Sequence, residues 1–288
     1  MTSSLSSLTG ADASFGFYHR YPSSGRSPDL VLAIERIEDF ATGRPRGPDY
    51  PGFQRALVAP QAVSLSRFDA EGTLHLPAPN DDPDDDPNDD PDDGRSNGPN
   101  GGEPPVRGSF RVGESQNSAE AVIRIGMSVA LPRIGGFIMH ASAIEVEGGA
   151  HIFAGVSGAG KSTIAAMLEE SWPACRKLSD ELLIVAPDDS GHMAVFVSPF
   201  IGSTGLPHGR SVPVRALYFL HQAPEHRREP MARGTGLREL LRHVLVYVAE
   251  ADTAARVLDA ASNLLSDITC HRLQFAKDPG VASVLALT

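Results

Sequence analysis

The feature that most constrains this chain is the segment of residues 155–162, which reads Gly-Val-Ser-Gly-Ala-Gly-Lys-Ser. It fits the pattern G-x-x-x-x-G-K-[ST], in which glycines let backbone N–H groups curl around an anion without Cβ clashes. An apolar run precedes it at residues 150–154, and a helical stretch follows it as far as Pro173. This order directs the positive end of a helix toward the anion. The pattern would arise by chance roughly 0.004 times in such a composition, so an incidental glycine-rich turn is disfavoured.

The loop therefore predicts a site for a nucleoside triphosphate. In such loops the lysine, here Lys161, contacts the outer phosphates, and the hydroxyl of the next residue, here Ser162, ligates Mg²⁺. The chain has only three lysines, Lys161, Lys177 and Lys277, so a lysine at this position is informative. The predicted nucleotide-binding residues are Gly155, Ser157, Gly158, Ala159, Gly160, Lys161, Ser162 and Thr163.

Charge and cysteine content exclude several classes of protein. The net charge is −11, but nine of the acids lie in residues 81–93, and the rest of the chain is near neutral at −2. No basic face is expected, which argues against nucleic-acid binding. Two cysteines cannot build a disulfide framework or a four-cysteine zinc site. No apolar run approaches the roughly 20 residues of a membrane span, and the N-terminus has no signal-peptide pattern. These features predict a cytoplasmic protein without a membrane partner.

The chain divides by composition into three parts. Residues 1–79 hold short alternating or apolar runs between Gly, Pro and Ser, which indicates a small β-rich region. Residues 80–107 are rich in Asp, Pro and Gly and predict a disordered insertion. A calcium site is the alternative for these aspartates, although the segment lacks the Gly and Glu pattern of an EF-hand. Residues 108–288 alternate between strand and helix patterns and form the third part.

Further elements are expected within this third part. Apolar spacing predicts helices at 118–133, 237–248 and 254–265, and strands at 109–112, 150–154 and 268–275. Residues 137–141 and 143–146 read as two strand pieces, and a last short helix is expected to begin at Asp278.

Four segments together resemble a known family. They are residues 139–143 (Met-His-Ala-Ser-Ala), 155–163, 178–181 (Leu-Ser-Asp-Glu) and 198–202 (Ser-Pro-Phe-Ile-Gly), and an extended run follows at 214–220. In this order they resemble the catalytic domain of HPr kinase/phosphorylase, which shares its fold with phosphoenolpyruvate carboxykinases. The resemblance implies an α/β (α+β) fold with a mixed sheet over residues 108–288. It also implies ATP as substrate and Mg²⁺ as cofactor.

The resemblance also implies roles for three further residues. Asp180 would act as the base that activates the acceptor, Glu181 would support the metal, and these two roles could be exchanged. His140 would help to orient the acceptor, and a carboxylate of the acid pair would complete the Mg²⁺ ligands that begin with Ser162 of the loop. From the residues alone, the two acids could be ordinary strand-edge acids and His140 a hydrogen-bonded strand histidine. Arg210 and Arg215 could neutralise transferred charge or simply be surface arginines.

Three departures from the family pattern limit which molecule can be expected as the phosphate acceptor. The chain has Asp180-Glu181 where HPr kinases have two aspartates, and His140-Ala141 where they have His-Gly. It also lacks a convincing Arg-Gly-Leu-Gly loop, which argues against HPr as the acceptor. We expect an ATP-dependent kinase acting on a hydroxyl, such as a serine of a peptide or small protein. The alternatives are a small-molecule kinase and a nucleotide-binding regulator without turnover. HPr kinases are hexamers, so the resemblance suggests a homo-oligomer, which no sequence feature fixes.

Overall fold

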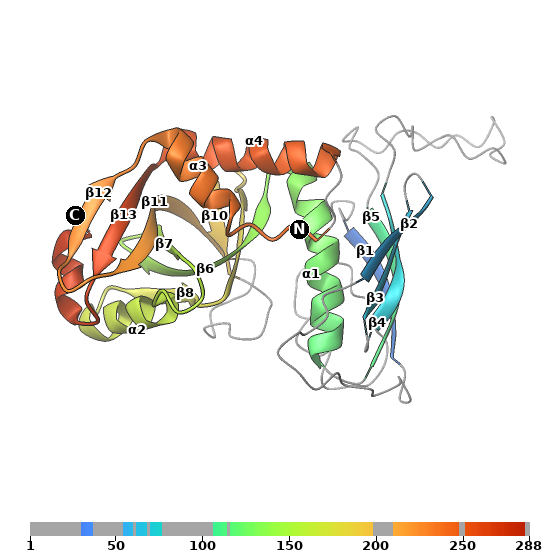
Figure 1. Ribbon diagram of the computed structural model, residues 1–288, viewed down its shortest axis with the longest axis horizontal. Helices are drawn as coiled ribbons and strands as arrows, with labels where there is room; N and C mark the ends of the chain where they lie inside the picture. The colour runs from blue at the N-terminus through green and yellow to red at the C-terminus, as the bar shows by residue number, and fades with distance from the viewer. Residues whose placement is uncertain are drawn as a thin grey trace. The chain divides into compact units, whose positions relative to one another are not determined.

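A computed structural model describes residues 30–36, 54–59, 62–67, 70–76, 106–113, 116–197, 210–247 and 251–285. The acidic segment 81–93 and the segment 198–202 lie outside the described residues. The chain divides into two compact units, Met1–Gly126 and Met127–Thr288 (Figure 1).

The first unit is built on a five-stranded sheet. Its strands are β1 (Leu30–Arg36), β2 (Gln54–Ala59), β3 (Ala62–Arg67), β4 (Ala70–His75) and β5 (Val106–Val112). They lie in the order β1-β5-β4-β3-β2, with β1 parallel to β5 and the other pairs antiparallel. The helix α1 (Gln116–Arg133) begins in this unit, and at Gly126 it approaches Leu30 and Leu32 of β1.

The described strands fit the predicted β-rich character of the N-terminal region, but the sheet extends beyond the predicted boundary at residue 79. β5 alternates buried and exposed residues along its whole length, which is the pattern of a half-buried strand. It pairs with both β1 and β4 inside the sheet. Residues 106 and 107, assigned from composition to the insertion, therefore belong to β5. The insertion connects neighbouring antiparallel strands, where added length raises the loop-closure free energy only slowly.

The second unit contains an eight-stranded mixed sheet. Its strands are β6 (Phe137–Val146), β7 (Gly149–Ala154), β8 (Arg176–Ser179), β9 (Leu182–Pro187), β10 (Met193–Phe196), β11 (Ser211–Gln222), β12 (Arg227–Pro230) and β13 (Thr269–Phe275). The order is β10-β9-β6-β7-β11-β13-β12, with β8 paired to β6 and β10 also paired to β11. β7, β11 and β13 run parallel, whereas β6, β9 and β12 are antiparallel to their neighbours. The predicted mixed sheet of an α+β fold is thus confirmed.

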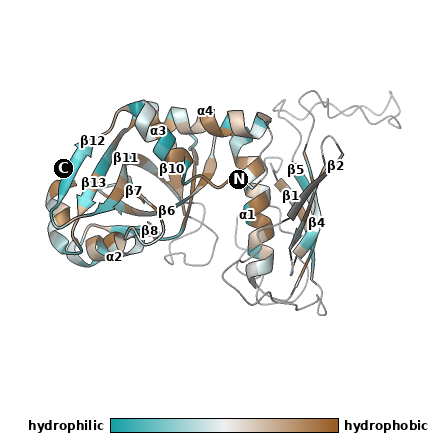
Figure 2. Ribbon diagram, viewed as in Figure 1, coloured by the Kyte–Doolittle hydropathy of each residue, from teal (hydrophilic) through white to brown (hydrophobic). Residues whose placement is uncertain are grey.

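Helices cover both faces of this sheet (Figure 1). They are α2 (Lys161–Ser171), α3 (Arg233–Leu241), α4 (Ala251–Asp267) and the 3-10 helix η3 (Pro279–Val284). Along β7, Ile152 and Ala154 pack in the core under α3 and α4, whereas Phe153 packs in the core that contains residues of α2. This alternation follows from the two-residue period of a strand. Figure 2 shows brown, apolar stretches on these strands between the helix layers.

Local boundaries differ from the sequence predictions in two places. The two strand pieces expected between residues 137 and 146 form one continuous strand, β6. The helix expected at 237–248 is α3, which begins earlier and ends at Leu241. Beyond it, Val244 forms a bridge with Met139, and the Leu245 N–H donates to the carbonyl of Ile138. Pairing with β6 therefore replaces helical hydrogen bonds there. No helix within the described residues is long and apolar enough to cross a membrane.

Candidate functional site

The loop between β7 and α2 needs glycine at two described positions. Gly158 has φ +78° and Gly160 has φ +101°, in the left-handed region that disfavours side chains. A Cβ on Gly160 would also lie 2.6 Å from Cζ of Phe275. Gly160 is the N-cap of α2, and no side chain caps this helix end. The first N–H groups of the helix, which have no intrahelical partners, are therefore available to an anion.

Lys161 lies beneath the loop rather than in solvent. Its ammonium donates to the carbonyl oxygens of Gly155 at 2.9 Å and Val156 at 3.2 Å. The residue is only 7% exposed, and burial lowers the pKa of its side chain. The loop carbonyls thus satisfy two of the three N–H donors of the ammonium, and these bonds must be exchanged if the lysine is to bind an anion.

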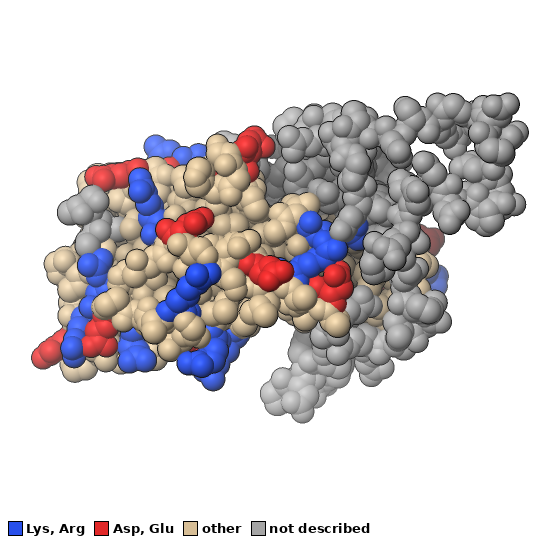
Figure 3. All heavy atoms as spheres, turned by 90° about the horizontal axis from the view of Figure 1, so that it is seen from above, with Lys and Arg blue, Asp and Glu red and all other residues tan. Residues whose placement is uncertain are grey.

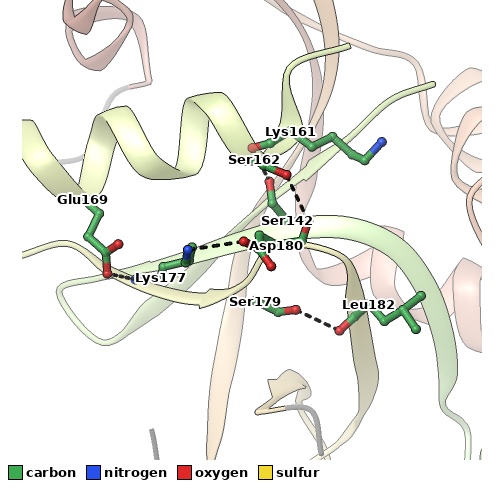
Figure 4. A network of polar contacts seen from close by, with 8 residues as sticks. All are labelled: Ser142, Lys161, Ser162, Glu169, Lys177, Ser179, Asp180 and Leu182. Atoms are coloured by element: carbon green, nitrogen blue, oxygen red, sulfur yellow. Dashed lines mark hydrogen bonds and ion pairs between the residues drawn. The ribbon is translucent and has the colours of Figure 1, made fainter. Parts of the chain in front are cut away.

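Three side chains hold the loop and the start of α2 in place. The Ser142 hydroxyl on β6 donates to the Lys161 carbonyl at 2.8 Å, and the Ser162 hydroxyl donates to the Asp180 carbonyl at 3.3 Å (Figure 4). The Gln222 amide at the end of β11 donates to the Gly158 carbonyl at 2.7 Å. Neighbouring strands of the sheet therefore set the loop conformation.

The acid pair lies between β8 and β9. Asp180 Oδ2 is 3.3 Å from the ammonium of Lys177, whose backbone N–H donates to Glu169 on α2 at 3.0 Å (Figure 4). The carbonyl of Glu181 accepts from the N–H of Ala141 on β6 at 3.1 Å. These contacts fix the backbone of the pair beside the start of α2, while the Glu181 residue remains exposed.

Two histidines meet at the β6 side of the site. The backbone N–H of His140 donates to the carbonyl of His243 at 2.8 Å. The His243 ring stacks on Phe219 with centroids 6.1 Å apart. Burial lowers the pKa of His243, and the nearby positive charge of Lys161 lowers it further. His243 is therefore a neutral imidazole at neutral pH, positioned close to the lysine of the loop.

One open cleft of about 610 Å³ collects most of the predicted residues. Its lining consists of His140, Ser157, Gly158, Gly160, Lys161, Ser162, Thr163, Asp180, Glu181 and Lys277. Of the residues predicted for the site, only Gly155 and Ala159 are absent from this lining, and both are buried behind the loop. Segments from four places in the sequence thus meet at the carboxyl end of β7.

Sequence reasoning gave no role to Lys277, His243 and Gln222, or to Ser142, which lies within the quoted 139–143 segment. Lys277 follows β13, and it lines the cleft although no motif includes it. The scarcity of lysine was the available signal. Lys161 and Lys277 line the cleft, and Lys177 contacts Asp180, so all three lysines of the chain lie at this site. The other three residues act through contacts between strands, which no local pattern reveals.

The two candidate arginines lie elsewhere. Both outer nitrogens of Arg210 donate to the Glu145 carboxylate, each at 2.6 Å, and this pairing lowers the pKa of Glu145. Arg215 lines a different cavity. Neither lines the cleft at the loop, so a role in neutralising transferred charge is not supported for either.

Oxygen ligands for a hard cation are present in the cleft. The Ser162 hydroxyl and the carboxylates of Asp180 and Glu181 are the donor types that Mg²⁺ prefers. Within the described ranges, no three His, Cys, Asp or Glu side chains are grouped to hold a metal by themselves. The residues fit a cation that takes its remaining ligands from phosphates and water. Figure 3 shows basic and acidic side chains interspersed on the described part of one face.

A family model and a solved structure each match part of the chain. A family model described as SynChlorMet cassette protein ScmC matches residues 116–251, which include the loop and the acid pair. A solved structure of the HPr(Ser) kinase/phosphatase from Coxiella burnetii is 12% identical, with 48% of this chain and 84% of that chain covered and a TM-score of 0.23. So low a TM-score does not establish a shared fold. No curated protein matches the chain.

Proposed function

We propose that this chain is an ATP-dependent phosphotransferase that acts on a hydroxyl group, such as a serine of a peptide or small protein. The single observation that supports this most strongly is the composition of the cleft. The 155–162 loop, the Asp180-Glu181 pair and His140 come from separate parts of the sequence and line the same cleft. A phosphoryl-transfer site requires this combination of anion-binding loop, carboxylates and acceptor space.

The loop residues would bind the triphosphate. Backbone N–H groups at the start of α2 and the Lys161 ammonium offer donors to phosphate oxygens. Lys161 must leave the carbonyls of Gly155 and Val156 to do so. Ser162, with Asp180 or Glu181, would hold the cation. Bound Mg²⁺ would neutralise charge on the outer phosphates.

The acid pair would activate the acceptor hydroxyl. A carboxylate oxygen of Asp180 accepts the proton of the acceptor hydroxyl as its oxygen bonds to the γ-phosphorus and the bond to the leaving ADP oxygen breaks. Lys177 holds this carboxylate at 3.3 Å and so fixes its direction. The side chain of His140 lines the same cleft, where it would orient the acceptor.

Two alternatives make different predictions. A small-molecule kinase would transfer phosphate to a low-molecular-weight alcohol and not to peptides. A regulator would bind ATP and leave it intact.

The test is a transfer screen with the full chain, Mg²⁺ and γ-labelled ATP. Serine-containing peptides, small alcohols and no acceptor are compared, and the products are identified by mass spectrometry. Phosphorylated peptide, with Asp180→Asn inactive and the exposed Asp189→Asn active, would support the proposal. Bound but unconsumed ATP across the whole set would favour the regulator, and a phosphorylated alcohol alone would favour the small-molecule kinase.

A further inference from the structure

A second cavity, of about 410 Å³, lies elsewhere in the same unit. It is lined by residues of β7, β11 and β13, including His151, Tyr218 and His271. The 155–162 loop follows the carboxyl end of β7, whereas His151 lies near the amino end of that strand. The two cavities share no lining residue.

The backbone is specialised to place Arg215 in this cavity. The pairing of β11 with β7 shifts between Val214 and Ala216, so Arg215 is the additional residue of a β-bulge. Bulges re-aim a side chain at a cost in regular pairing. The Arg215 side chain then crosses Gly149, where a Cβ would lie 2.1 Å from its Cγ. Both the bulge and the glycine are needed for this path.

The turn before Gly149 places Glu147 at the cavity. Glu147 and Gly148 are the two residues that join β6 to β7, and their φ values of +51° and +76° are those of a type I′ hairpin turn, which requires positive φ at both positions. The hairpin between β6 and β7 therefore brings a carboxylate to the lining of the cavity.

A row of three stacked rings forms one wall of the cavity. The Tyr218 ring lies 6.0 Å from the ring of His151 and 5.5 Å from that of His271. The Tyr218 hydroxyl donates to the Leu285 carbonyl at 3.1 Å and lies 3.3 Å from His151 Nδ1. Burial, aided by Arg215, lowers the pKa of His151 to about 4, so this ring is neutral at neutral pH. The row of uncharged rings therefore separates the two arginines that line the cavity, Arg215 and Arg228, from the apolar core of the unit.

One ring nitrogen at the cavity lacks a protein partner, since His271 Nδ1 is buried without a hydrogen bond. Arg228 donates to the Leu285 carbonyl and hydrogen-bonds the Tyr218 hydroxyl, and within the described residues no ion pair of Arg228 or Arg215 with a carboxylate is found. Glu147 and the exposed Asp267 also line the cavity, so its charged side chains carry no net charge. A lining without an excess of positive charge disfavours a polyanion.

We propose that this second cavity binds a small ligand through a single oxyanion group, a carboxylate or a phosphate, held by Arg215 and Arg228. Arg215 precedes Ala216, which pairs with Thr269, and Arg228 pairs with Leu273, so His271 lies between the two positions along β13. Both arginines line the cavity, which their long side chains reach from β11 and β12. Guanidinium groups bind both oxyanions through paired N–H donors.

The test follows the imidazole NMR signals of His151 and His271 in the full chain at fixed neutral pH. The signals are assigned from their loss in His151→Gln and His271→Gln. Inorganic phosphate and sodium acetate are titrated separately. Since phosphate could also occupy the 155–162 loop, the titration is repeated in Lys161→Ala. The variants are Arg215→Gln, Arg228→Gln and Gly149→Ala, which displaces Arg215 without changing charge, and Arg238→Gln on α3 is the control.

We expect saturable shifts of both signals with at least one anion, unchanged in Lys161→Ala and Arg238→Gln. The apparent Kd should rise at least about fivefold in each cavity variant that retains native circular dichroism. Which anion binds more tightly identifies the ligand as a phosphate or a carboxylate. The proposal is overturned if neither anion gives a saturable shift, or if Arg215→Gln and Arg228→Gln both respond like wild type.

Discussion

The Lys161 ammonium donates to the carbonyl oxygen of Gly155, six residues earlier, at 2.9 Å. This bond closes the 155–162 loop on itself and buries the charge of the lysine. An anion that enters the loop must therefore offer Lys161 at least as good a set of acceptors as the loop carbonyls do. Phosphate oxygens, which carry negative charge, meet this requirement better than neutral groups.

Replacement of Gly160 tests whether the loop conformation is required. Gly160→Ala adds left-handed strain of about 1–2 kcal/mol and places a Cβ 2.6 Å from Phe275. Gly191→Ala is the matched control, since Gly191 has φ +82° and no atom lies within 4 Å of its added Cβ. Urea unfolding is followed by fluorescence of Trp172, which is the one tryptophan of the chain.

We expect Gly160→Ala to lower the free energy of unfolding by at least about 2 kcal/mol, against about 1 kcal/mol for Gly191→Ala. Equal losses in the two variants would show that Phe275 yields without cost and that contact with it does not fix the loop.

Lys277 should contribute to nucleotide affinity although it lies 116 positions after Lys161 in the sequence. Its side chain lines the cleft and is exposed, so loss of its charge should weaken binding only moderately. We expect Lys277→Ala to raise the Kd for Mg²⁺·ATP about threefold to tenfold, which corresponds to about 1 kcal/mol. Calorimetry measures this, with Arg238→Ala as control. Wild-type affinity in Lys277→Ala would remove Lys277 from the site.

Replacement of Asp180 distinguishes ATP binding from phosphoryl transfer. Asp180→Asn keeps the shape of the side chain but removes the base and the ion pair with Lys177. Transfer should slow by at least about 10²-fold, while Mg²⁺·ATP still binds through the loop. Rates are measured with the acceptor found in the screen, and Asp189→Asn serves as control. A wild-type rate in Asp180→Asn would assign the base elsewhere, with Glu181 the next candidate.

The free energy of unfolding should decrease as the pH falls, because of the titration of His151. Its pKa is about 4 when folded and near 6.5 when unfolded, so the unfolded chain takes up a proton first as the pH falls. The contribution of this group is constant above about pH 6.5 and decreases toward pH 4. Between pH 7 and pH 5, wild type should lose about 2 kcal/mol more unfolding free energy than His151→Gln. Urea unfolding at both pH values measures it, and equal losses would contradict the lowered pKa.

The parts of the fold that depend on interactions between residues close in the sequence could be predicted from local sequence patterns. The loop and α2 follow from glycine conformation and helix spacing, and η3 begins where Asp278 accepts from the Gly280 N–H at 2.9 Å. The mixed sheet follows from the apolar strand runs. The end of α3 was not predictable, because Val244 pairs with Met139 about 100 residues earlier. Its apolar spacing suits a helix as well as a buried strand edge.

The sequence motifs of the site could be predicted, but the full set of residues that surround the cleft could not. Residues 155–162 and the acid pair could be selected from their sequence alone. Lys277 reaches the cleft, and His243 contacts His140 at its edge, only through strand order, which places β13 beside β11 and the 244–245 segment beside β6. Arg210 could not be separated from an active-site arginine, because its partner Glu145 lies 65 positions away.

The most direct test of the central claim is a calorimetric titration of Mg²⁺·ATP into wild type and Lys161→Ala. The loop requires the lysine to pair with phosphates, so wild type should bind one ATP saturably, and Lys161→Ala should bind at least about tenfold more weakly with unchanged circular dichroism. Equal affinity in the two proteins, or no binding by wild type, would contradict the account.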